Sequence, residues 1–237
     1  MLKLRASGSL HEALGDTPTD LRALLRQMTG QNFRRINRFI ELALVGALRC
    51  RQAAGEIAPD CALYLACDSP MLADSVKILQ GMHDQCRPPS PFEFMNVSGN
   101  MAGYYVASQL TLNGPQLAVH RNHAGLEAAL ELLMLDSARH RRALIGYVEE
   151  GVWPLREQRL RLGLAEDATL FECSHWFYFD RDCTTPLALV EYADDTITPS
   201  VHGMETALAL SRYLGGTMAE PLRLGANLRV RGPVTAS

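Results

Sequence analysis

Long apolar runs and a strong net charge are both missing from this chain of 237 residues. The longest apolar stretch, residues 42–48, is far shorter than the roughly 20 residues that cross a bilayer. The first residues lack the apolar core of a signal peptide. The formal net charge of -3 gives no overall positive field for a polyanion. We therefore expect a cytoplasmic protein whose partners include neither membrane nor nucleic acid.

Phosphate-binding and metal-binding motifs are missing as well. There is no Gly-x-Gly-x-x-Gly and no Gly-Lys-Ser/Thr, so Gly99 and Gly103 indicate helix packing rather than a nucleotide site. The nearest approach to a metal site, Cys173 with His175 and Cys183, lacks paired Cys-x-x-Cys spacing. The six cysteines form no compact framework, which suits reduced thiols. The sequence thus predicts core cysteines, a surface histidine, no metal and no cofactor.

The composition that remains is that of a globular protein, with 47% hydrophobic and 21% charged residues. A chain of this length can bury a sizeable core in one domain over residues 1–237. Short apolar strands alternating with helices predict an α/β layered sheet. The predicted strands are 62–67, 116–120, 142–148 and 187–192. The predicted helices are 19–29 within a helical lead-in over 1–30, then 36–54, 71–82, 99–112, 124–135, and 203–214 within a C-terminal helix and tail over 200–237.

The helix predicted for residues 124–135 is apolar nearly all round. Its only charged residues, Glu127 and Glu131, are four positions apart and share one narrow stripe. A helix of this kind is buried between layers. We therefore expect a third layer or a partner subunit to cover it.

Two groups of polar residues have a role that the local sequence leaves open. His120 and His123 lie where a strand passes into a helix, but two histidines without a carboxylate or cysteine beside them specify no reaction. Arginines also cluster, in residues 34–38, 139–142 and 156–161. These clusters are either solvated helix ends and loops or a patch that docks an acidic partner.

Four short motifs follow one another over residues 90–125. They read Ser90-Pro91-Phe92, Asn100-Met101-Ala102-Gly103, Leu112-Asn113-Gly114-Pro115 and His120-Arg121-Asn122-His123-Ala124-Gly125. The order resembles the nucleophile-bearing half of a β-ketoacyl synthase. That family has a Ser-Pro-Phe lead-in, an Asn-Met-x-x-Gly helix start, a Gly-x-Gly-Pro turn and a Thr-Ala-Cys-x-Ser-Gly elbow. The resemblance covers about residues 35–192, is strongest over 88–130, and implies a thiolase-like fold. Here that fold would be a single amino-terminal half, with a layered mixed sheet flanked by helices.

The chain departs from this family at the catalytic position. Counting back from Gly125 places Asn122 where the family has its cysteine. An amide cannot carry an acyl group as a thioester. The family's second half, with two histidines that assist decarboxylation, has no counterpart beyond the fragment Val201-His202-Gly203. The resemblance therefore implies a chain that does not catalyse condensation by itself.

Subunits of this family that lack the cysteine are chain-length factors, which pair with an active ketosynthase and shape its acyl tunnel. The resemblance implies a heterodimer with a ketosynthase and transient contact with an acyl carrier protein. Polyketide or polyene assembly is the expected setting, ahead of fatty-acid synthesis. Two alternatives stay open: a degenerate scaffold without a tunnel role, and an enzyme that uses His120 or His123 on an acyl thioester.

The same resemblance implies two sets of site residues. The dimerising strand would comprise Gln116, Leu117, Ala118 and Val119, and the tunnel wall would comprise Glu93, Phe94, Met95, Val97 and Ser98. The prolines of Arg87-Pro88-Pro89-Ser90-Pro91 favour an extended lead-in, so residues 92–98 are predicted to be a semi-rigid segment. Phe94 and Met95 would stop the growing chain, or else fill this protein's own core. Glu93 would face solvent or be held by an arginine.

Overall fold

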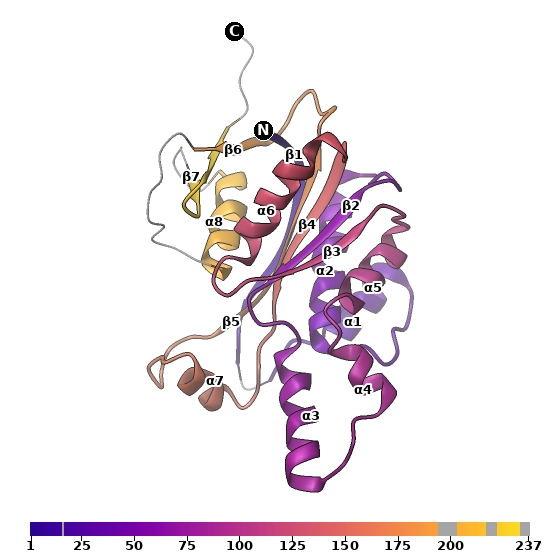
Figure 1. Ribbon diagram of the computed structural model, residues 1–237, viewed down its shortest axis with the longest axis vertical. Coiled ribbons are helices and arrows are strands. Elements are labelled where there is room, and N and C mark those ends of the chain that lie inside the picture. The colour runs from indigo at the N-terminus through magenta and orange to yellow at the C-terminus, as the bar shows by residue number, and fades with distance from the viewer. Residues whose placement is uncertain (16, 194–202, 217–221, 233–237) are drawn as a thin grey trace.

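The computed structural model describes residues 1–15, 17–193, 203–216 and 222–232. These residues form one eight-stranded mixed sheet in the order β3-β2-β4-β5-β1-β6-β8-β7, with helices on both faces (Figure 1). The prediction of an α/β layered mixed sheet flanked by helices is confirmed. No helix in the described part of the chain is long and apolar enough to cross a membrane.

The strands divide into a parallel and an antiparallel part. β2 pairs in parallel with β3 and β4, whereas β4 with β5, β5 with β1, and every pair beyond β1 are antiparallel. The strands are β1 Leu2–Ala13, β2 Ala62–Cys67, β3 Gln116–His120, β4 Arg142–Glu149, β5 Phe171–Asp180, β6 Ala188–Tyr192, β7 Leu222–Leu224 and β8 Leu228–Arg231. β2 and β3 have the predicted bounds, and β4 and β6 differ from theirs by one residue.

The helices pack on the two faces of this sheet. They are α1 Leu21–Thr29, α2 Arg38–Ala54, α3 Leu72–Gln85, α4 Pro91–Asn96, α5 Met101–Leu110, α6 Gly125–Leu135, α7 Leu155–Arg161 and α8 Met204–Leu214, with a short 3-10 helix at Asp136–Ala138. α1, α2 and α5 bury their apolar residues against one face, and α6 and α8 against the other. Figure 1 shows α3 and α4 extending beyond the end of the sheet.

The two long central strands, β1 and β5, were not predicted. Residues 1–30 are not a helical lead-in throughout, because Leu2, Leu4 and Ala6 alternate as buried residues with the period of a strand. α2 packs so closely on β1 that a Cβ added at Gly8 would overlap the backbone nitrogen of Cys50. Only a glycine allows this approach of helix to sheet.

The C-terminal segment covers the apolar helix α6. Thr206 of α8 donates a hydrogen bond of 2.8 Å to Glu127, and Asn227, in the turn between β7 and β8, donates one of 2.9 Å to Glu131. The predicted C-terminal helix is thus α8, and two short strands follow it where a tail was predicted. Residues 200–202, 217–221 and 233–237 of that prediction lie outside the described residues. Since α8 and the β7–β8 turn together cover the polar stripe, α6 needs no further layer there, although Leu135 at its end is 74% exposed.

Candidate functional site

The turn between β3 and α6 forms one wall of a cleft of about 570 Å³. Asn122 and His123 line it together with Asp68, Tyr147 and Glu149 from the carboxyl ends of β2 and β4. His123 has a φ of 60°, and its carbonyl oxygen accepts a 3.0 Å hydrogen bond from the backbone of residue 203. The structure therefore places two of the three predicted polar residues of this turn in the cleft.

His120 does not line this cleft. Its Nδ1 lies 3.0 Å from Sγ of Cys67, and its ring occupies the space that a side chain at Gly99 would need. Burial lowers the pKa of His120 and raises the pKa of Cys67, which keeps both groups neutral. The two residues are direct neighbours in the parallel register of β2 and β3. The expectation that the histidines have no cysteine or carboxylate beside them was therefore wrong.

Three carboxylates around the cleft were not foreseen from the sequence. Glu149 accepts hydrogen bonds from the backbone N–H groups of Asp68 and Ser69, the second at 3.1 Å. Glu150 accepts a hydrogen bond of 3.1 Å from the backbone N–H of Ala73. Asp68 in turn accepts a 3.2 Å hydrogen bond from the backbone N–H of Gly125 at the start of α6. The carboxylates thus tie the ends of β2 and β4 to α3 and α6.

Burial raises the pKa of all three groups. The pKa of Glu149 and of Glu150 rises to about 7, and that of Asp68 rises above its ordinary value. Both glutamates can therefore give or take a proton near neutral pH. Asn122 offers only an amide beside them, so position 122 supplies no nucleophile. The signal for the site was available in principle, because ligand sites gather at the carboxyl ends of parallel strands.

The predicted tunnel residues lie on and after α4. Phe94 and Met95 are 65% and 45% exposed, so they do not fill this protein's own core. Val97 packs partly against the core beneath α2 and α5, and Ser98 is half-buried. Whether any of these residues borders an acyl chain stays a prediction.

Most of the segment 92–98, which was predicted to be semi-rigid, is helical, because α4 runs from Pro91 to Asn96. Ser90 accepts a hydrogen bond from the backbone of Glu93, and Glu93 accepts one from the backbone of Ser90, which is a capping box with Pro91 in the first turn. The Ser-x-x-Glu spacing was the signal for this helix. Arg87 also binds both Glu93 oxygens, at 2.9 and 3.0 Å, so the carboxylate is held by an arginine. These contacts lower the pKa of Glu93 to about 2.

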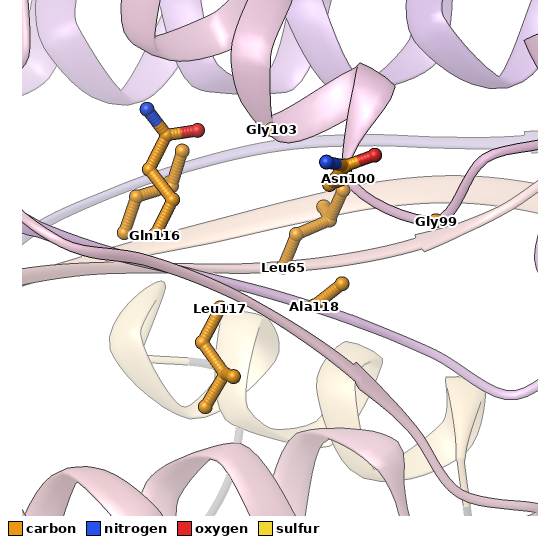
Figure 2. Close-up of a pocket in the computed structure, with 8 residues that line it drawn as sticks. Leu65, Gly99, Asn100, Gly103, Gln116, Leu117 and Ala118 are labelled. Carbon is orange, nitrogen blue, oxygen red and sulfur yellow. The ribbon is translucent and has the colours of Figure 1, made fainter. Parts of the chain in front are cut away.

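The predicted dimerising strand, β3, is the outermost strand at one end of the sheet. Gln116 and Leu117 are exposed, Ala118 is half-buried and Val119 is buried. Among the described residues β3 pairs with β2 alone. Figure 2 shows Gln116 and Leu117 pointing to opposite sides of the sheet, beside a cavity of about 20 Å³ that also borders Asn100. A cavity of this size holds about one water molecule, so it is no acyl tunnel.

The fold has clear counterparts among solved structures. A ketosynthase (ApeO) in complex with its chain length factor (ApeC) from Xenorhabdus doucetiae matches with a TM-score of 0.61 and 13% identity, over 97% of each chain. The ishigamide ketosynthase/chain length factor matches with a TM-score of 0.64 and 17% identity, over 82% of this chain and 67% of that one. This chain has a ketosynthase-like fold. The predicted thiolase-like fold is thereby confirmed.

The lengths of the matches differ between these structures. A ketosynthase from module 6 of the bacillaene synthase of Bacillus subtilis 168 matches over 84% of this chain but only 45% of its own, with 12% identity and a TM-score of 0.55. This ketosynthase-like fold therefore spans less than half of the longer enzyme and nearly all of the matched chain from Xenorhabdus doucetiae. No protein-family model and no curated protein sequence matches the chain.

Proposed function

We propose that this chain is a non-catalytic, chain-length-factor-like subunit that pairs with an active ketosynthase in the cytoplasm and shapes its acyl tunnel. One observation carries the proposal. This chain matches a chain from a complex of a ketosynthase with its chain length factor, over 97% of its own length and 97% of the matched chain's length. A subunit of this size thus has a precedent in such a complex. The amide of Asn122 in the cleft supports a role without a nucleophile. Product assembly would be of the polyketide or polyene type, with an acyl carrier protein as transient partner.

Two exposed features fit a partner subunit. The first is β3, whose outer edge pairs with no other strand of the described residues and so offers backbone groups to a partner strand. The second is a set of apolar side chains on α3 and α4, which we call the α3–α4 surface. It comprises Leu79, Met82, Phe92, Phe94 and Met95, each 45% to 65% exposed. Exposed apolar residues on two helices that contact each other, as α3 and α4 do, are typical of protein interaction sites. A ketosynthase that paired with β3 and covered this surface would account for both features.

Replacing Leu117 with aspartate should abolish co-purification with the ketosynthase partner. The carboxylate would be desolvated beside the pairing strand, at a cost of several kcal/mol. The test is co-expression with a tagged ketosynthase from the same genome, followed by size-exclusion chromatography. Leu187→Asp is the matched control, because Leu187 is 47% exposed against 45% for Leu117 and lies next to β6. Co-elution that survives Leu117→Asp, or that Leu187→Asp removes equally, would contradict pairing through β3.

Replacing Phe94 with alanine should lengthen the products of the reconstituted pair. The exposed ring lies on the surface that the partner would cover, so its removal would open space at the end of the acyl pocket. The measurement is the product distribution by mass spectrometry, alongside the yield of intact complex. Met95→Ala and Val97→Ala are comparison variants, because they remove side chains of different size close to Phe94 in the sequence. Unchanged product length in all three variants, with the complex intact, would leave only a scaffold role.

A further inference from the structure

Three side chains that can bind a metal meet between β1 and β5. His11 is the direct cross-strand partner of Cys173, and Ser9 is the partner of His175. Residues two apart on a strand point to the same face, so His175 lies beside this pair. The ligand atoms of His11, Cys173 and His175 all lie within 4.8 Å of one another. The prediction of a surface histidine was wrong for His175, because it is fully buried.

The spacing of the two imidazole rings suits a shared cation. Nε2 of His175 lies 3.4 Å from Nδ1 of His11. In a tetrahedral site with zinc–nitrogen bonds of about 2.0–2.1 Å, two ligand nitrogens are about 3.3–3.4 Å apart. Two ring nitrogens that face each other at this distance need either a proton or a metal ion between them.

Ser211 of α8 orients the buried ring. Its Oγ lies 2.7 Å from Nδ1 of His175, the nitrogen that faces away from His11. When Ser211 accepts the Nδ1–H proton, Nε2 carries the lone pair and points toward His11. Metal-binding histidines are commonly held in this way through their second nitrogen. The ring of His11 is fixed in addition by stacking on Phe171, with ring centres 4.9 Å apart.

We propose that His11, Cys173 and His175 bind one divalent cation of the zinc class, with water as the fourth ligand. Imidazole and thiolate are the ligands that select zinc and chemically similar ions. On binding, Cys173 releases its thiol proton to solvent, and the two imidazoles bind through neutral nitrogens. The three ligand atoms lie within 4.8 Å of one another, whereas nitrogen and sulfur ligands of one zinc ion lie about 3.5 Å apart. Rotation of the Cys173 side chain would bring its sulfur to this distance from the two nitrogens.

An entry path and a structural role follow from the position of this site. His11 is half-buried, and Phe171, which stacks on it, is 38% exposed and lines the cleft. A cation can therefore reach the site from the cleft side. Because the three residues come from the two central strands and Ser211 comes from α8, bound metal would fasten β1, β5 and α8 together. Metal binding would then add to the free energy of unfolding.

The test is titration of the full-length protein with Co²⁺, followed by displacement with Zn²⁺. We expect one equivalent of Co²⁺ per chain, with a thiolate-to-cobalt charge-transfer band and the intense visible bands of tetrahedral Co²⁺. Cys173→Ser should remove the charge-transfer band, and Ser211→Ala should weaken binding about tenfold to a hundredfold. Cys50→Ser is the matched control, because Cys50 is also fully buried but lies on α2.

His11→Ala keeps the test decisive if Cys173→Ser fails to fold, since His11 is only half-buried. Zn²⁺ should raise the melting temperature of the unmodified protein and leave that of His11→Ala unchanged. Binding without a charge-transfer band, or an equal response of His11→Ala to Zn²⁺, would overturn the proposal. So would loss of the band in Cys50→Ser.

Discussion

Replacing Arg38 with alanine should lower the free energy of unfolding by about 3–5 kcal/mol. Arg38 binds both oxygens of Glu172, at 2.5 and 2.8 Å, and the Glu172 side chain is only 1% exposed. Without the guanidinium, Glu172 would be a buried carboxylate with no oppositely charged partner among the residues that the structure describes. The pair also joins α2 to β5, with the Arg38 guanidinium 5.2 Å from the ring centre of Trp153. Urea denaturation followed by circular dichroism would measure the loss.

An exposed ion pair provides the control for this variant. Arg141 and Asp182 are 67% and 45% exposed and form a similar contact, so Arg141→Ala should cost less than about 1 kcal/mol. Adding Glu172→Gln to Arg38→Ala should recover part of the loss, because the uncompensated charge is removed. Equal stability of Arg38→Ala and Arg141→Ala would show that the buried pair contributes no more than a surface pair.

Raising the pH from 5 to 8 should destabilise the protein through Glu149 and Glu150. Burial raises the pKa of each from 4.5 to about 7 in the folded state. Between these values the folded state holds protons that the unfolded state has released. The free energy of unfolding therefore falls as the pH rises through this window and levels off above about 7. A shift of this size corresponds to at most about 3 kcal/mol for each carboxyl group.

Amide variants separate these groups from the rest of the protein. Glu149→Gln and Glu150→Gln should each flatten the dependence of the unfolding free energy on pH between 5 and 7. Glu166→Gln, at an exposed position after α7, is the control and should keep the original slope. A flat profile in the unmodified protein, or a slope that neither amide variant changes, would count against the protonated carboxyl groups.

The elements that the sequence predicted best are those with a uniform pattern of apolar residues. β2 is one continuous apolar run bounded by polar residues and a proline, and its bounds were correct. β5 was missed because Glu172, Ser174 and His175 interrupt its apolar residues. Each of these polar groups is satisfied by a hydrogen-bonding partner within the fold: Arg38 for Glu172, the indole of Trp176 for Ser174, and Ser211 for His175. Arg38 was accordingly expected at a solvated helix end or in a docking patch.

Only the part of the candidate site that lies within one short segment was predicted from the sequence. Asn122 and His123 belong to one short turn, so local sequence was enough to single them out. Asp68 and Glu149 are 81 residues apart in the chain, and they meet only because β2 and β4 are neighbouring parallel strands. Strand order of this kind depends on the packing of the whole sheet. The contact between the Asp68 backbone and the Glu149 carboxylate was therefore out of reach of a local pattern.

The two ends of the sheet differ in a way that limits how copies can assemble. β3 at one end has five residues, and the described part of β7 at the other end has three. Within the described residues β3 therefore offers a longer edge for an added strand than β7 does. Two chains that joined edge to edge at β3 would each use up the long edge. A pair joined in this way would have no free β3 edge left, so growth through this edge would stop at two chains.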